Sequence, residues 1–154
     1  MMEEYQKTDS VDGKEICIVS LGRSSNPDLI KDYLQFVLSE KVASQDVHTG
    51  AASLAANAKA RTLMWDFLKA NWSLVEQRLG SNKVLLQRFV KLSLAKFADH
   101  DVEQDIERFF EDKDKGGIDR SLLIVSDSIR TNANYKARDE KLVLEWLKAH
   151  GYAA

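Results

Sequence analysis

The chain has 154 residues, of which 44% are apolar and 30% are charged, and it carries a formal net charge of -2 at pH 7. This length fits a single domain with a real hydrophobic core. The near-neutral charge argues against a nucleic-acid partner, because contact with phosphates requires a concentrated basic surface. No apolar run approaches the ~18 residues that a membrane-spanning helix needs, so we also expect no membrane partner.

Apolar residues recur at helical spacing along most of the chain, which predicts a series of amphipathic helices. A single proline and seven glycines disfavour an all-β fold, since such a fold needs a turn every ~8–12 residues. In chain order, the predicted helices cover residues 12–21, 27–39, 45–56, 59–70, 72–79, 83–97, 100–113, 118–129 and 138–149.

Local signals mark where several of these helices begin and end. Asn26 is a preferred cap, with Pro27 at the first helical position and Asp28 in the first turn. The pair Gly116-Gly117 predicts a break between two later helices. We therefore predict a partly flexible lead-in over residues 1–11, one helical domain over 12–150 and a tail over 151–154.

Each predicted helix has an apolar side that needs a neighbour in water. Successive helix pairs that bury these sides predict an all-α superhelix of about eight helices, similar to HEAT and armadillo solenoids. A compact helical bundle is the alternative. Tryptophan at helical spacing is typical of packing, so we expect the three tryptophans in the core.

Two features favour a cytoplasmic location. Residues 1–12 are polar and acidic, unlike a signal peptide. Cys17 is the single cysteine, so no internal disulfide is possible and a reducing compartment is expected. We also expect Cys17 to be buried and inert.

Several sequence blocks, in their order and spacing, carry a family resemblance. The most specific block is Trp65-Asp66-Phe67 followed by Asn71-Trp72, and Pro27-Asp28-Leu29-Ile30, Phe109-Phe110 and Trp146-Leu147 add to it. Together they resemble the C-terminal helical domain of zinc metallo-aminopeptidases of the puromycin-sensitive and antigen-trimming type, including the fungal members. The resemblance covers nearly the whole chain.

The resemblance implies a non-catalytic role. Such enzymes remove N-terminal residues from peptides with a zinc ion held on a separate domain. Their C-terminal domain is a curved stack of helices that encloses the substrate chamber and gates peptide access. The implied partners are therefore the catalytic domain of a parent aminopeptidase and peptides.

No catalytic residue and no metal ligand are expected in this chain. His48, His100 and His150 lie far apart in the sequence, and none begins an H-E-x-x-H motif. Zinc hydrolysis needs three fixed ligands, an open position and a base. The zinc would belong to the catalytic domain of the parent enzyme, and the chain alone is expected to be an inactive piece of a metallopeptidase.

Three basic residues are candidates for contact with peptide. In antigen-trimming relatives a basic residue at the position matching Arg23 faces the groove, which implies that Arg23 binds a peptide carboxylate here. The alternative is a solvated arginine at a helix terminus. Arg88 and Lys91 lie one turn apart on an otherwise apolar helix, so they point either into the chamber or toward the catalytic domain, or else form a salt-bridged polar edge.

A second function stays open beside the enzyme domain. A free-standing α-solenoid adaptor would bind a protein partner along its concave surface. In either case, a domain separated from its neighbours exposes apolar surface, so the isolated chain is expected to self-associate.

Overall fold

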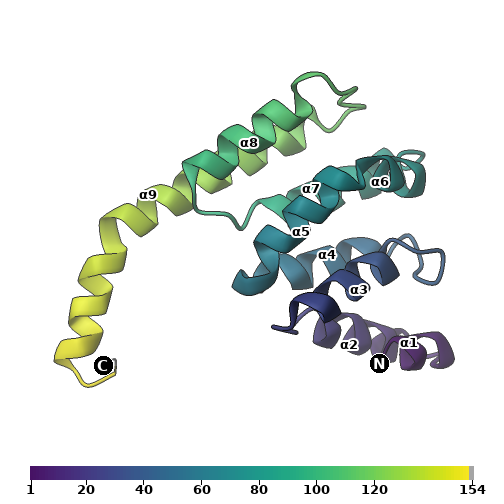
Figure 1. Ribbon diagram of the computed structural model, residues 1–154, viewed down its shortest axis with the longest axis horizontal. Coiled ribbons are helices and arrows are strands. Elements are labelled where there is room, and N and C mark those ends of the chain that lie inside the picture. The colour runs from purple at the N-terminus through teal and green to yellow at the C-terminus, as the bar shows by residue number, and fades with distance from the viewer. Residues whose placement is uncertain (153–154) are drawn as a thin grey trace.

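The computed structural model describes residues 1–152, and every regular element in that range is an α-helix, which confirms the all-α prediction (Figure 1). The helices are α1 (Met2–Lys7), α2 (Val11–Leu21), α3 (Pro27–Val37), α4 (Val47–Ala56), α5 (Ala58–Ala70), α6 (Trp72–Leu79), α7 (Lys83–Leu94), α8 (His100–Glu111) and α9 (Asp119–Ala149).

Side-chain caps fix many of the helix starts. The Asn26 carboxamide oxygen accepts from the backbone N–H groups of Asp28 and Leu29, with Pro27 at the first helical position. Asp99 accepts from the N–H of Asp101 in the same way. The predicted cap of α3 is therefore confirmed, and α8 begins with a side-chain cap of the same kind.

The helices form a superhelix rather than a compact bundle. In one layer α2 packs on α4, α4 on α7, and α7 on the first half of α9. In the second layer α3 packs on α5, and Trp65 of α5 donates from Nε1 to Asp105 of α8 at 2.8 Å. The stack curves from α1 and α2 at one end to α8 and α9 at the other (Figure 1).

An aromatic cluster joins α5, α6 and α8. The ring of Phe110 lies 4.9 Å from the rings of Trp72 and Phe109, and Trp65 lies 5.2 Å from Phe109. Trp65 and Trp72 are buried as predicted. Trp146 is 55% exposed, so the prediction that all three tryptophans belong to the core is wrong, because the half of α9 that carries Trp146 has no neighbour here.

A short helix, α1, forms within residues 1–11, the predicted lead-in. Within α1, Tyr5 is buried, and its hydroxyl donates to Asp46 and accepts from the backbone N–H of Ala43. One aromatic residue in a six-residue helix gives no periodic pattern, so the sequence offered no signal for it. Cys17 of α2 is buried, as expected.

The last two predicted helices are one continuous helix, α9, of 31 residues. Residues 130–137 contain neither glycine nor proline, so nothing stops the helix although the apolar pattern lapses there. Ala133 is its last buried residue, and residues 134–152, which we call the C-terminal arm, bend away from the body (Figure 1). Within residues 1–152, no helix combines the length and the apolar character that crossing a membrane requires.

Candidate functional site

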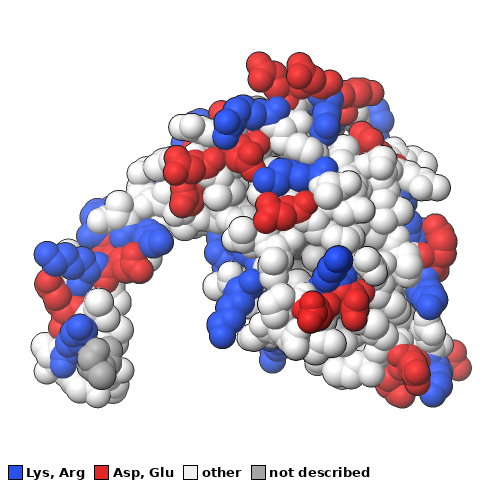
Figure 2. All heavy atoms as spheres, viewed as in Figure 1, with Lys and Arg blue, Asp and Glu red and all other residues white. Residues whose placement is uncertain are grey.

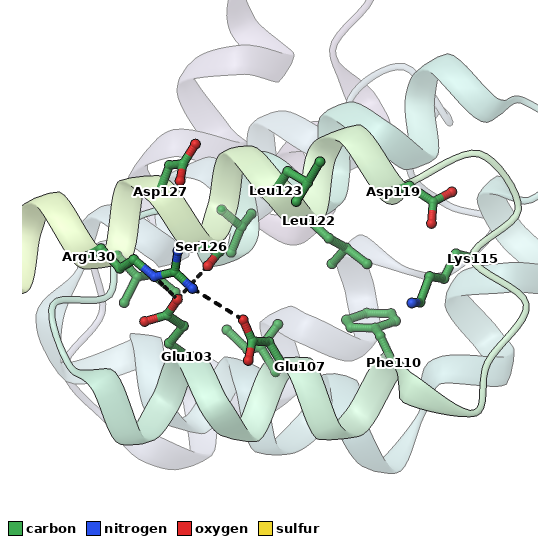
Figure 3. Close-up of a pocket in the computed structure, with 13 residues that line it drawn as sticks. Glu103, Glu107, Phe110, Lys115, Asp119, Leu122, Leu123, Ser126, Asp127 and Arg130 are labelled. Atoms are coloured by element: carbon green, nitrogen blue, oxygen red, sulfur yellow. Dashed lines mark hydrogen bonds and ion pairs between the residues drawn. The ribbon is translucent and has the colours of Figure 1, made fainter.

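A groove of about 360 Å³ runs between α8 and the first half of α9 (Figure 3). Its volume lies within the range of ~300–1,000 Å³ that small ligands occupy in proteins. Apolar residues at helical spacing form its floor, because both helices turn their apolar faces toward each other: Ile106 and Phe110 from α8, and Leu122, Val125 and Ile129 from α9.

One end of the groove holds a buried carboxylate with several partners. The side chain of Glu103 is 7% exposed, and its Oε1 lies 2.6 Å from Nε of Arg130 and accepts from the hydroxyl of Ser126. Its Oε2 lies 3.2 Å from Nδ1 of His100. Arg130 also reaches Glu107, at 3.6 Å, so one guanidinium serves two carboxylates (Figure 3).

These partners determine the protonation of Glu103. Burial alone would raise the pKa of its carboxyl. Hydrogen bonds from Ser126 and His100, together with the charge of Arg130, outweigh burial and hold the pKa below its ordinary value. Glu103 is therefore charged at neutral pH. Both of its carboxylate oxygens have partners, which is typical of a structural ion pair and not of a catalytic acid.

The stability of the protein is expected to fall with pH below the ordinary Glu pKa of 4.5, partly through Glu103. A carboxyl whose pKa is depressed on folding stabilises the protein above its unfolded pKa, and that contribution is lost as the pH falls through the folded pKa. Glu103→Gln should therefore flatten the fall. Urea denaturation at several pH values between about 3 and 7 measures how the free energy of unfolding depends on pH. Part of the fall at acid pH should remain in the variant because of Asp105, whose pKa is also lowered by hydrogen bonds from Lys69 and Trp65.

Glu111→Gln is the matched control for this prediction. Glu111 is an exposed acid on the same helix, and it makes no side-chain hydrogen bond or ion pair with any residue of the range 1–152. If Glu103→Gln and Glu111→Gln changed the pH dependence equally, the Glu103 cluster would not be a source of acid sensitivity.

The opposite end of the groove lies at the loop between α8 and α9. Lys115 extends from the loop after α8 toward the ring of Phe110, and Asp119 lies across from it at the start of α9 (Figure 3). Gly116 and Gly117 have φ angles of 51° and 92°, a conformation that favours glycine, and they turn the chain sharply at this end, as predicted.

The arrangement suits binding rather than catalysis. Ser126 and His100 both bond to Glu103, so the serine is not hydrogen-bonded to the histidine that would have to activate it. The groove instead offers an apolar floor between charged ends, which fits an apolar side chain inserted from a peptide or a neighbouring domain.

Zinc does not fit the side chains that the structure brings together. Across residues 1–152 no three or more His, Cys, Asp or Glu side chains lie where they could jointly hold a metal ion. His48, His100 and His150 belong to α4, to α8 and to the C-terminal end of α9. A catalytic zinc site needs three converging protein ligands, which these histidines do not supply.

The predicted site residues lie outside the groove. Arg23, Arg88 and Lys91 are all exposed, and none of them forms an ion pair within the described part of the chain. Arg23 follows α2 and lines a shallow hollow of about 300 Å³ with Ala56 and Asn57 at the end of α4. Arg88 and Lys91 project from α7.

Arg88 lies near the opposite end of α4 from Arg23. Burial lowers the pKa of His48, and the positive charge of Arg88 lowers it further. His48 and Ala56 are eight residues apart on α4, a distance of about 12 Å along a helix. The structure therefore separates Arg23 from Arg88 along α4 instead of gathering them at one point.

The cluster around Glu103 was not predicted from the sequence. Its members come in pairs four residues apart, Glu103 with Glu107 and Ser126 with Arg130, so each pair shares a helix face. That spacing is common on solvated helices, and only the packing of α8 on α9 turns these two faces toward each other.

Comparison with known proteins gives the family. Residues 1–131 match the family described as ERAP1-like C-terminal domain. The chain is 26% identical over 148 residues to the alanine/arginine aminopeptidase of Saccharomyces cerevisiae. This match covers 96% of this chain and 17% of the yeast protein. It is 27% identical over 135 residues to aminopeptidase M1 of Arabidopsis thaliana, and 25% identical over 126 residues to aminopeptidase N of Bos taurus.

These matches cover 88% and 79% of this chain, but only 15% and 13% of the plant and bovine proteins. The chain thus spans about one sixth of the length of the relatives that it matches. The predicted resemblance is confirmed, because the family match covers most of the chain and the relatives are aminopeptidases. This chain belongs to the ERAP1-like C-terminal domain family, the C-terminal domains of M1 aminopeptidases.

Proposed function

We propose that this chain is the non-catalytic C-terminal helical domain of a zinc aminopeptidase that removes N-terminal residues from peptides. The observation that carries the proposal is the similarity to a yeast aminopeptidase over 96% of the chain. In this proposal the zinc and the peptide-bond chemistry belong to the catalytic domain of the parent enzyme. A cytoplasmic location is part of the proposal, supported by the lone, buried Cys17.

The role we propose is to enclose the substrate chamber and gate peptide access. The curvature of the helix stack supports it, because a concave array of paired helices, of the kind found in HEAT repeats, forms an extended wall. Figure 2 shows a hollow between the arm and the body, with Lys and Arg side chains along the edge of the body that faces it. A wall of this kind excludes folded proteins by size, and its movement would control entry and exit.

Arg23, Arg88 and Lys91 are the proposed peptide contacts. Their exposure supports this role, as does the lack of an intramolecular ion pair for any of them within residues 1–152. A guanidinium forms paired, charge-assisted hydrogen bonds with a carboxylate. The separation of Arg23 and Arg88 along α4 implies that one peptide carboxylate binds one of them, and that longer peptides extend toward the other.

Activity measurements test the proposal. The partner is the yeast alanine/arginine aminopeptidase shortened by the segment that matches this chain. This chain alone is expected to cleave neither an alanyl anilide nor a longer peptide with N-terminal alanine. Added to the shortened enzyme, it should raise kcat/KM for the peptide relative to a small folded protein with the same N-terminal residue, since the chamber wall is restored.

Two results would count against this function. One is zinc-dependent peptidase activity of this chain by itself. The other is a peptide-to-protein selectivity that stays the same whether or not the chain is added, which would favour the free-standing adaptor. Replacing Arg23, Arg88 and Lys91 with alanine tests the contacts. KM for the longer peptide is expected to rise by up to about fivefold, and KM for the anilide should not change.

A further inference from the structure

The C-terminal arm has no neighbour in the body. Within the range 1–152, the side-chain hydrogen bonds, ion pairs and aromatic contacts of residues 134–152 join arm residues only to one another. The last anchor before it is Asn132, which donates from Nδ2 to the carbonyl oxygens of Ala95 and Phe97 at 3.1 and 2.9 Å. Beyond that anchor the helix runs free of the superhelix (Figure 1).

The arm nevertheless carries a line of exposed apolar side chains. Tyr135, Leu142 and Trp146 fall at helical spacing on one stripe, and they are 57%, 63% and 55% exposed. The rings of His150 and Tyr152 stack on Trp146, with centroids 4.1 and 6.1 Å away. This stripe, Tyr135, Leu142 and Trp146, is the apolar stripe of the arm.

Away from the stripe, the arm carries both polar and apolar side chains. Lys141 and Glu145 form an ion pair there at 3.9 Å, and Leu144, which is 44% exposed, lies on the face opposite the stripe. A solvated helix has no need for a line of two aromatic residues and a leucine. A helix of this length without tertiary packing is also only marginally stable in water, because most helical stability in proteins comes from a packed apolar face. We therefore expect the stripe to pack against a partner surface.

Two observations indicate what covers it. The family match ends at residue 131, next to Ala133, the last buried residue, so the self-contained body ends where the arm begins. The yeast alanine/arginine aminopeptidase matches 96% of the chain, so its match includes most of the arm. The arm is thus shared with a protein in which about five sixths of the polypeptide lies outside the segment represented here.

We propose that the apolar stripe of the arm docks on the remaining part of the aminopeptidase polypeptide, in an apolar slot on its surface. This inference rests on the proposed function, and it adds the surface through which the domain attaches. The Trp146 end, with its stacked His150 and Tyr152, forms the broadest apolar contact, since aromatic side chains bury the most area in an interface. The arm bends away from the body (Figure 1), and all three side chains of the stripe are more than half exposed.

A binding experiment with matched variants tests the inference. The chain is mixed at tens of micromolar with the yeast alanine/arginine aminopeptidase shortened by its matching segment, and the complex is followed by light scattering and hydrogen exchange. We expect a one-to-one complex in which amide exchange over residues 134–149 slows at least tenfold. The intact yeast enzyme, whose own segment fills the place, should not bind.

The variants separate the stripe from the rest of the arm. Leu142→Glu and Trp146→Glu should each weaken the complex at least tenfold. Leu144→Glu, which adds the same charge to the same helix on the face opposite the stripe, should change the affinity less than twofold. Unchanged exchange in α2–α8 of each variant shows that the body is intact.

The outcomes are distinct. A complex that forms with an unprotected arm, and that Leu142→Glu leaves unaffected, overturns the docking role of the arm but not the proposed function. The absence of any complex overturns both. A stable dimer of the chain with a protected arm, which the shortened enzyme does not displace, makes a second copy the occupant and also overturns the inference.

Discussion

Replacing Phe110 with alanine is expected to lower the free energy of unfolding by about 3–5 kcal/mol. Phe110 is 1% exposed, and its ring packs edge-on against Trp72 and Phe109 with centroids 4.9 Å away. Removing it leaves a cavity that the surrounding rings cannot fill, because they are held on three different helices. Chemical denaturation followed by tryptophan fluorescence and by circular dichroism measures the loss.

The control for this prediction is Leu123→Ala. Leu123 is 68% exposed on α9, so the substitution removes apolar atoms without opening a cavity, and the change should stay within about 0.5 kcal/mol. A loss below about 1 kcal/mol for Phe110→Ala would mean that α8 does not pack on α5 and α6 as the structure has it.

Replacing Gly22 with alanine is expected to destabilise the protein by about 1–3 kcal/mol, the usual cost of overpacking. A Cβ at Gly22 would lie 2.1 Å from Oγ and 2.6 Å from Cβ of Ser53 on α4. The φ angle of Gly22 is -67°, which any residue adopts, so the cost comes from space and not from backbone strain. Denaturation midpoints of the single variants measure it.

The double variant Gly22→Ala with Ser53→Gly separates the clash from other causes. Ser53→Gly alone should cost about 0.5 kcal/mol through lost helix propensity, in addition to the lost hydrogen bond from the Ser53 hydroxyl to the Val19 carbonyl oxygen. In the double variant most of the clash is gone, so the combined loss should fall short of the sum of the single losses by at least about 0.5 kcal/mol. Strict additivity would show that α2 and α4 do not approach as closely as described.

The helix boundaries illustrate what local chemistry specifies. Asn26 with Pro27 marks a helix start in the sequence, and α3 begins at that signal. These signals act within one turn of the chain, so no knowledge of distant contacts is needed to interpret them. The continuity of α9 was not predictable in the same way. The loss of apolar periodicity after Ile129 predicts a break, although residues 130–137 contain no glycine or proline to end the helix.

The candidate site illustrates the opposite case. Glu103 and Arg130 are 27 residues apart, and each is unremarkable on its own helix. They meet because α8 and α9 turn back on each other at Gly116 and Gly117 and pack their apolar faces together. The burial that makes Glu103 a hydrogen-bond centre exists only after that packing.

The sequence by itself determined the helical class, most helix limits and the family. Apolar periodicity, helix caps and family-specific sequence blocks are all local features of the amino-acid sequence. Tertiary structure decided which faces meet: the groove between α8 and α9, the close approach of Gly22 to Ser53, and the arm whose apolar stripe stays uncovered. The physical reason is that burial and electrostatic environment depend on neighbours far away in the chain, and apolar spacing alone does not say whether a neighbour belongs to the same domain.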